Sequence, residues 1–424
     1  MKALTLPSCG YRTVATWCSA LALTLGLIAC GGGGDSSTPT NPVASNSTGI
    51  SQGTIAGFGS IIVNGVRYDD SSASVSYTDD DDNGDRRRDD LRLGMVVTIN
   101  GSSGTATGTA TAISFGSELK GPVRSMSMPQ STSSTVASAS QTQTLNILGQ
   151  QVEINQRTVF DSVSLPNGYA DIRVGQVLEI HGLLDVTANK LLATRIEREN
   201  NANKYKIVGN INSANLTSKT FKIGSETIQY GATEAKRLRA AIVDGATVRV
   251  TLATTPAGTD TWNATRIVSK QRFVGSLVRF EVEGIITAYT SAAQFSIGTL
   301  NINASNATFP RGNTGLGLGS RVEVKGQLVN DVFVATSVKI ENRGNVSPSN
   351  NEDNDQIELH GAISNLNTTD KIFTLRGLQV SYAGVVTYRK GTASNLVNGV
   401  KVEVKATLTG TGTALQAQRI SFED

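Results

Sequence analysis

The feature that most constrains the fold is a pattern of short β segments that occurs five times along the chain. Each copy opens with glycine, one variable residue and isoleucine or valine, and it continues into two apolar segments joined by a glycine turn. A chain that repeats one short unit folds as a series of similar modules. The five openings are Gly53-Thr54-Ile55, Gly121-Pro122-Val123, Gly209-Asn210-Ile211, Gly284-Ile285-Ile286 and Gly361-Ala362-Ile363.

A second glycine, followed by a strictly alternating segment, recurs at intervals of 70 to 81 residues. Apolar residues stand three and five positions after it, as Val322 and Val324 do after Gly319, with polar residues such as Glu323 between them. Alternation with a period of two is typical of a strand that buries one face. The five glycines are Gly94, Gly175, Gly245, Gly319 and Gly399.

Together these patterns predict an all-β protein of tandem, small, five-stranded barrels, for which the OB-fold is the nearest named architecture. Closing each sheet into a barrel removes the edges that would otherwise invite aggregation. A module this small buries only about 60% of its unfolded surface, so each repeat is expected to be marginally stable alone.

The segment that ends at Cys30 carries the features of an export signal. Lys2 and Arg12 supply positive charge, and residues 15–29 form an apolar stretch that is shorter than the about 20 residues needed to span a bilayer. Leu27-Ile28-Ala29-Cys30 resembles the lipobox of bacterial lipoproteins, in which the thiol receives a diacylglyceryl group before cleavage. We therefore expect a flexible tether that starts at a lipidated Cys30.

The lipobox resemblance also implies an address. Gly31, rather than aspartate, follows the cysteine, which by resemblance to lipoproteins of double-membraned bacteria favours the outer membrane, with the protein periplasmic or surface-exposed. Several acyl chains of the palmitate type would anchor the chain stably. The alternative is an ordinary signal peptide in which Cys30 falls by chance.

These observations divide the chain into segments. The predicted ranges are 1–29 for the signal peptide, 30–52 for the lipidated cysteine and tether, 53–118, 119–200, 205–270, 273–342 and 356–424 for the five β repeats, and 343–355 for a linker.

Cysteine content and charge exclude several classes of function. Cys9 and Cys18 leave with the signal and Cys30 carries lipid, so the mature chain has no disulfide or thiolate chemistry. Without the signal, 36 basic residues face 35 acidic ones, so no basic field favours nucleic acid. Aromatic residues are scarce, with Trp262 the one tryptophan of the mature chain, whereas barrels that bind single-stranded nucleic acid need stacked aromatics.

Three segments of the first repeats resemble a family of bacterial lipoproteins. They are Gly53-Thr54-Ile55-Ala56-Gly57-Phe58-Gly59-Ser60-Ile61-Ile62-Val63-Asn64-Gly65-Val66, Leu91-Arg92-Leu93-Gly94-Met95-Val96-Val97 and Leu119-Lys120-Gly121-Pro122-Val123. The repeat of that family is the domain of unknown function 5666. The resemblance is closest over residues 53–200 and looser from 205 to 424. It implies export and a barrel-like repeat, and it brings no activity and no site residues.

No catalytic constellation is visible in the sequence. The two histidines, His181 and His360, fall in different repeats at different strand positions, and we predict both to be exposed strand residues. Glu179, Glu323 and Glu403 recur at equivalent positions of different repeats, which indicates a solvated strand face rather than the single carboxylate pair of a hydrolase. The sequence therefore predicts a protein that is not an enzyme.

One acidic segment interrupts the first repeat. Oxygen donors stand at positions 1, 3, 5 and 12 of residues 79–90, with Gly84 at position 6, which is the spacing of a calcium loop. Three arginines at positions 8 to 10, aspartate rather than glutamate at position 12 and the lack of flanking helices depart from that pattern. The alternative is a soluble hairpin tip whose charges offset each other. The candidate calcium ligands are Asp79, Asp81, Asn83, Asp85 and Asp90.

The expected function is non-catalytic binding by the tandem barrels of a membrane-anchored lipoprotein. The expected ligand is a glycan, an envelope polymer or a protein, since OB-like barrels present one binding face. Two alternatives stay open, a purely structural envelope spacer and an extracytoplasmic hydrolase with an unrecognised site. Calcium is the one cofactor that the sequence suggests.

Overall fold

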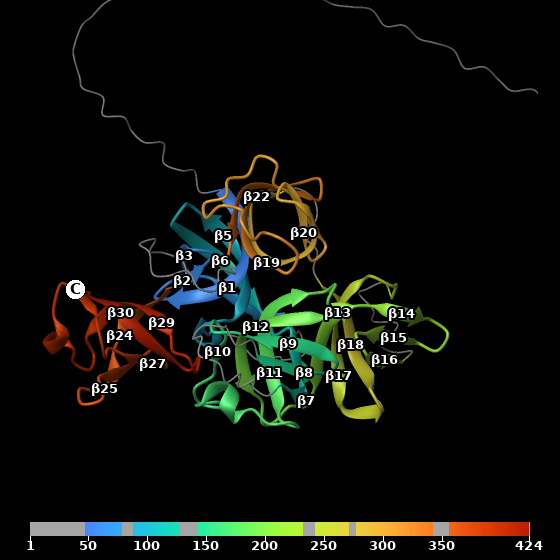
Figure 1. Ribbon diagram of the computed structural model, residues 1–424, viewed down its shortest axis with the longest axis horizontal. Coiled ribbons are helices and arrows are strands. Elements are labelled where there is room, and N and C mark those ends of the chain that lie inside the picture. Colours follow the sequence, from blue (N-terminus) through green and yellow to red (C-terminus); the bar gives the residue numbers. More distant parts are fainter. Residues whose placement is uncertain are drawn as a thin grey trace, which may run out of the picture. The chain divides into compact units, whose positions relative to one another are not determined.

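The computed structural model describes residues 47–78, 88–127, 143–231, 242–270, 277–341 and 356–423 (Figure 1). These residues form strands together with the short 3-10 helices η1 (Arg88–Asp90), η2 (Gly168–Asp171) and η3 (Ala393–Asn395). The predicted all-β class is confirmed.

Every repeat closes into a five-stranded barrel with the same pairing order. The first strand pairs with the second and the fourth, the fifth pairs with the fourth, and the third and fifth run parallel. In the fourth repeat, Val282 faces Val324 across the first and fourth strands, and Val324 faces Val338 across the fourth and fifth. Ile302 of the third strand lies beside Phe333 of the fifth in the parallel pair. This order confirms the predicted OB-like tandem barrels.

The strand bounds of the five barrels are as follows. The first barrel has β1 (Ser47–Phe58), β2 (Ile61–Val63), β3 (Val66–Asp69), β5 (Val96–Ser103) and β6 (Thr107–Phe115), with β4 (Ser74–Tyr77) beside β6. The second has β7 (Leu119–Met126), β8 (Gln143–Ile147), β9 (Gln150–Ile154), β11 (Val177–Asp185) and β12 (Lys190–Arg198), with β10 (Val159–Phe160) beside β12. The third has β13 (Tyr205–Asn210), β14 (Asn212–Asn215), β15 (Thr220–Ile223), β16 (Glu226–Tyr230), β17 (Thr247–Gly258) and β18 (Thr261–Ser269).

The fourth barrel has β19 (Leu277–Ser291), β20 (Gln294–Ile297), β21 (Leu300–Asn303), β22 (Arg321–Val329) and β23 (Val332–Ile340). The fifth has β24 (Ile357–Ala362), β25 (Ser364–Asn367), β26 (Ile372–Leu375), β27 (Leu378–Ser381), β29 (Lys401–Leu408) and β30 (Ala414–Phe422), with β28 (Thr387–Arg389) beside β30. In the third and fifth barrels the first strand is interrupted, so β13 with β14, and β24 with β25, each form one of the five strands.

The alternating apolar residues fill the barrel interiors. Val322 and Val324, the two positions singled out in the fourth repeat, are both 0% exposed. Each of the last three barrels also buries a phenylalanine from its second strand, Phe221, Phe295 or Phe373. The cores are therefore aliphatic with a few aromatic side chains, as interiors filled by side chains rather than by a ligand require.

The two glycine motifs of the repeat meet in one backbone contact. In the fourth barrel the N–H of Gly319 donates to the carbonyl of Ile286 at 2.8 Å, and the N–H of Ile286 donates to the carbonyl of Ser320 at 2.9 Å. The glycine adopts a positive φ, between 79° and 92° in the five repeats, which a residue with a Cβ atom adopts only at a cost. We call this pair of hydrogen bonds the paired-motif contact. The five glycine donors and their acceptors are Gly94 and Ile55, Gly175 and Val123, Gly245 and Ile211, Gly319 and Ile286, and Gly399 and Ile363.

Replacing Gly319 by alanine is expected to destabilise the fourth barrel by about 1–2 kcal/mol. A Cβ atom at Gly319 would meet nothing within 4 Å, so the loss comes from the left-handed backbone alone. Gly317 is the matched control, because its Cβ atom also has open space and its φ is ordinary. Gly317→Ala should be neutral or stabilise by up to about 1 kcal/mol. Urea unfolding followed by hydrogen exchange over residues 277–341 measures both, and equal effects of the two variants would contradict the expectation.

Strand β1 begins at Ser47, within the range 30–52 predicted for the tether, and not at Gly53, where the first repeat is predicted to begin. Residues from Ser47 to Thr54 pair with β5, and Ile50 to Gln52 pair in parallel with β19 of the fourth repeat. Gly57 and Phe58 pair in parallel with β24 of the fifth repeat. The predicted tether is therefore too long, because backbone pairing orders polar residues whose side chains carry no alternation.

Candidate functional site

Most of the residues predicted as sites lie outside the described part of the chain. This holds for Cys30 and for Asp79, Asp81, Asn83 and Asp85 of the acidic loop. Asp90, the last of the candidate calcium ligands, lies in η1. The lipidation and calcium assignments therefore stay predictions from the sequence.

The prediction that His181 is an exposed strand residue is wrong. Its side chain is 2% exposed, on β11, which lies against β5 and β19 of other repeats. Burial lowers the pKa of the imidazole, although Glu179 and Glu197 act in the opposite direction. Strand alternation identified the face on which His181 lies, but it could not show that other repeats cover that face.

The recurrent glutamates do not form a simple solvated face either. Glu179 forms an ion pair with Lys120 at 2.7 Å, Glu323 with Lys339 at 3.4 Å and Glu403 with Arg419 at 3.0 Å. Glu323 is only 7% exposed. The equivalent positions therefore carry cross-strand ion pairs, which the strand period alone does not reveal.

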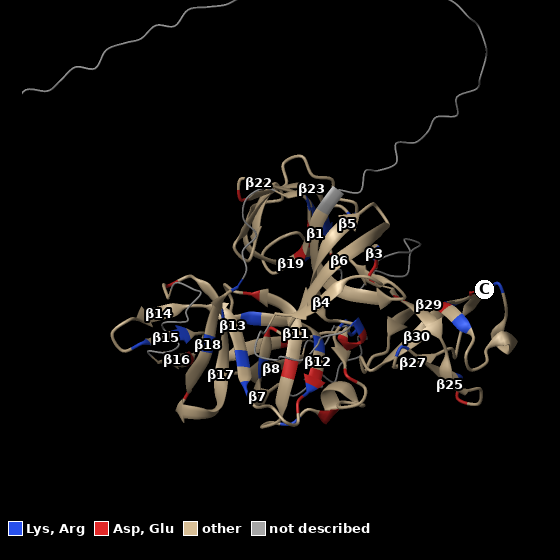
Figure 2. Cartoon of the chain, turned by 180° about the vertical axis from the view of Figure 1, so that it is seen from behind, with Lys and Arg blue, Asp and Glu red and all other residues tan. Residues whose placement is uncertain are grey.

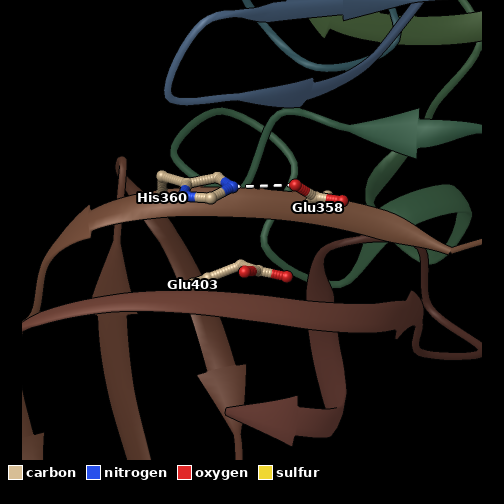
Figure 3. Close-up of side chains that lie close together, drawn as sticks. All are labelled: Glu358, His360 and Glu403. Carbon is tan, nitrogen blue, oxygen red and sulfur yellow. Dashed lines mark hydrogen bonds and ion pairs between the residues drawn. The ribbon is translucent and has the colours of Figure 1, made fainter. Parts of the chain in front are cut away.

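The prediction that His360 is exposed is also wrong, because its side chain is only 14% exposed. It belongs to a cluster of titratable side chains on the fifth barrel. Glu358 and His360 stand two residues apart on β24, so they share one face of the strand. Glu403 lies directly opposite His360 on the antiparallel strand β29. Figure 3 shows the imidazole and the Glu358 carboxylate side by side, with Glu403 on the neighbouring strand. One ligand atom from each of the three lies within 4.8 Å of the other two.

Both ring nitrogens of His360 face carboxylates. Nε2 lies 2.8 Å from Oε1 of Glu358, and Nδ1 lies 2.5 Å from Oε1 of Glu423, near the end of the chain. The hydrogen bond with His360 lowers the pKa of Glu358 to about 2, with help from Arg67 and Lys405 against the effect of burial. Burial opposes protonation of His360, but its hydrogen bonds to the two glutamates raise its pKa overall. The cluster therefore holds imidazole nitrogen and carboxylate oxygen together, partly shielded from water.

Three cations border this cluster. Arg67 of β3 forms an ion pair with Glu358, Lys405 lies 3.6 Å from the other Glu358 oxygen, and Arg419 binds Glu403. Nη2 of Arg67 also lies 2.6 Å from Nε2 of His360. The negative charge of the carboxylates is thus partly offset, and a cation already stands where Glu358 and His360 meet.

A second polar cluster is mostly buried. Nζ of Lys206 lies 2.8 Å from Oγ of Ser117 and 3.1 Å from the hydroxyl of Tyr77. Burial lowers the pKa of Lys206 well below its ordinary range. A lysine with a lowered pKa next to a serine hydroxyl has the residue types of a nucleophile and its base. Ser117 is 0% exposed, however, so a substrate cannot reach it, and the cluster satisfies buried polar groups instead.

A shallow groove lies on the third barrel. It measures about 380 Å³ and is lined by Asn203, Lys204, residues 252–255 and Thr265. Five of its seven lining residues have polar side chains, and one of these, Lys204, is charged. Such a groove offers hydrogen-bond partners without a dedicated catalytic group.

Among the described residues, no helix is both long enough and apolar enough to cross a membrane. A comparison with curated proteins finds no match. One matching solved structure is described as drosophila Unr CSD456. It is 15% identical, the match covers 52% of this chain and 96% of that chain, and the TM-score is 0.12.

A family model described as a domain of unknown function, DUF5666, matches residues 134–197, 283–339 and 360–421. The three matches fall in the second, fourth and fifth barrels, so they are not concentrated in residues 53–200, where the sequence resemblance is closest. Each matched segment contains the glycine of the paired-motif contact, Gly175, Gly319 or Gly399. Three of the five barrels therefore contain a segment that matches the domain of unknown function DUF5666, consistent with repeats of that domain.

Proposed function

We propose that this chain is a non-catalytic lipoprotein of the outer membrane, anchored through lipid on Cys30, whose tandem barrels bind a polar ligand of the cell envelope or its surroundings. The lipobox-like segment before Cys30 supports the anchor. The repetition of one barrel supports binding or scaffolding, because a repeated module multiplies one surface along the chain and can add avidity.

The observation that carries the choice of ligand is the burial of the aromatic side chains. Among the described residues, Tyr289 is the one aromatic side chain that is exposed, at 39%, while Trp262 is 7% exposed. Single-stranded nucleic acid is held on such barrels by stacking on exposed aromatics, and apolar rings also line most small-molecule sites. A polar polymer or a protein held by hydrogen bonds and charge therefore fits these surfaces better than a nucleic acid.

The charge distribution agrees with this choice. In Figure 2 the basic and acidic positions of the described strands are interspersed rather than gathered by sign. Many of them are engaged with each other, as Lys325 is with Glu323 at 3.1 Å. Such a surface lacks the basic stripe that binding to a phosphate backbone needs.

A structural spacer is the second candidate, since a shallow groove and polar strand faces suit a chain that only holds a distance. A hydrolase is less favoured, because the serine and lysine that resemble a nucleophile and its base are enclosed. The spacer and the binding protein differ in one measurable property, which is whether the barrels bind anything once the lipid is removed.

The test uses the mature chain from residue 31 onward, purified without lipid, and envelope fragments from the producing bacterium. We expect saturable binding to fragments that is lost when an excess of unlabelled chain competes. Parallel samples of protein-free sacculi and of protein-bearing outer membrane separate a polymer ligand from a protein ligand. An absence of saturable binding to both would contradict the binding function and favour the spacer.

The acidic loop predicts calcium-dependent stability of the first barrel. Seven aspartates fall within residues 79–90, and a divalent cation would relieve their mutual repulsion. Extracellular modules bind calcium at about 10⁻⁴ to 10⁻³ M, and a ligand at a hundred times its Kd stabilises the folded state by about 2.7 kcal/mol. Melting curves of the mature chain with calcium and with chelator should differ in the parent and coincide in Asp81→Ala/Asp90→Ala. If millimolar calcium does not change the melting midpoint of the parent, the calcium site is contradicted and the segment is an acidic turn that binds no metal.

A further inference from the structure

The fifth barrel places three metal-ligating side chains on one patch of sheet. Residues two apart on a strand share a face, and the residue directly opposite on an antiparallel neighbour lies about 5 Å away. Glu358 and His360 meet the first condition, and His360 and Glu403 meet the second. The rigid barrel thus holds two carboxylates and an imidazole within 4.8 Å of one another without help from a flexible loop (Figure 3).

A separate observation concerns the far side of the imidazole. Nδ1 of His360 lies 2.5 Å from a Glu423 carboxylate oxygen, so Nδ1 carries a proton and donates it in that hydrogen bond. Nε2 is then the nitrogen through which the ring can bind a metal ion. It lies 2.8 Å from Oε1 of Glu358. A metal ion bound to both atoms would take the place of the proton or the guanidinium that lies between them in the metal-free chain. A carboxylate behind a ligating histidine is the usual support of a metal-bound imidazole.

The position where Glu358 and His360 meet already attracts a cation. Nη2 of Arg67 lies 2.6 Å from Nε2 of His360 and pairs with Oε1 of the same glutamate. Arg67 comes from β3 of the first barrel, so this cation is supplied from outside the fifth barrel. The Nη2 amino group carries two N–H donors and contacts both atoms, so a metal ion that binds them must displace it.

We propose that Glu358, His360 and Glu403 form a binding site for a divalent first-row transition-metal ion such as Zn²⁺, and that this ion displaces the guanidinium of Arg67. Imidazole with carboxylate is a ligand set for zinc and its neighbours in the first row, whereas calcium and magnesium take oxygen ligands. Lys405 contacts Oε2 of Glu358 and Arg419 contacts Oε1 of Glu403, and such neighbours orient carboxylates around bound metals.

Displacement of Arg67 gives the site a distinctive energetic signature. A ligand residue supplies affinity, so its removal weakens metal binding. A competing cation costs affinity, so its removal strengthens metal binding. Arg67→Met keeps the aliphatic length of the side chain and removes the charge, and it should therefore bind zinc more tightly than the parent.

The experiment is a calorimetric titration of Zn²⁺ into the mature chain, purified without a histidine tag and kept in millimolar calcium to saturate the acidic loop. We expect one zinc per chain in the parent. His360→Gln should lose this binding, and Glu423→Gln should weaken it by about tenfold or more. Arg67→Met should strengthen it. Gln379→Ala, at an exposed position of β27 in the same barrel, is the matched control and should equal the parent.

Because the chain has only two histidines, imidazole NMR signals report the site directly. Zinc should shift the His360 signals and leave those of His181 unchanged, and melting curves of each variant confirm that it is folded. The proposal is overturned if zinc leaves the His360 signals in place or if folded His360→Gln binds zinc as the parent does. Equal or weaker binding by Arg67→Met would overturn the assignment of Arg67 as the displaced cation. This outcome is independent of whether the barrels bind an envelope ligand.

Discussion

Val324→Asp is expected to unfold the fourth barrel. Val324 lies on β22, is 0% exposed and packs in the core that includes Phe280 and Phe333. A carboxylate at this position would be buried without a partner, which places the substitution among the most damaging, at about 4–5 kcal/mol or more. Small domains have a total stability of about 5–15 kcal/mol, so little would remain. Hydrogen exchange should show loss of protection across residues 277–341.

Val334→Asp is the matched control for this substitution. Val334 is also a valine of the fourth barrel, on β23, but it is 37% exposed. An aspartate there stays hydrated, so the free energy of unfolding should change by less than about 1 kcal/mol. Similar losses of protection in the two variants would mean that the strand register, and with it the inward face of β22, is wrong.

Cys30→Ser is expected to abolish lipidation altogether. The serine hydroxyl cannot replace the thiol that we propose receives the diacylglyceryl group, so a fatty-acid probe should no longer label the protein. Without acyl chains the membrane anchor is lost, and the protein should either stay uncleaved or leave the outer-membrane fraction. Labelling and fractionation of cells that produce the variant measure both effects.

The other two cysteines serve as controls for this result. Cys9 and Cys18 precede Cys30 in the predicted signal peptide, so Cys9→Ser and Cys18→Ser should label as the parent does. Labelling that persists in Cys30→Ser, or that follows either of the other cysteines, would remove the basis for the lipid anchor.

The barrel could be predicted from the sequence because its determinants repeat locally. The inward face of β22 was identified by Val322 and Val324, since strand alternation depends only on neighbouring residues. The glycines could be located for a related reason. A positive φ, as at Gly319, restricts the residue type strongly enough to leave a mark in every copy.

The candidate site could not be predicted, because it depends on register and on contacts between distant segments. Glu358 and His360 are visible as neighbours on a strand, but Glu403 joins them only through the pairing of β24 with β29. Glu423 and Arg67 reach the same imidazole from the end of the chain and from the first repeat. The prediction that His181 is exposed failed for the same reason, since other repeats cover its strand.

The paired-motif contact explains how these modules can differ in length and keep one architecture. The contact brings together the two ends of an intervening chain segment. This segment runs from Val123 to Gly175 in the second repeat but only from Ile286 to Gly319 in the fourth. Closing a longer segment costs little extra entropy, because the entropy cost of loop closure grows only with the logarithm of loop length. The acidic residues 79–90 and the serine-rich residues 128–142 both lie between the two motifs of their repeats. The segment between the two motifs of a module therefore tolerates insertions, so new loops can be added there by duplication or grafting without a change in the strand pairing of the barrel.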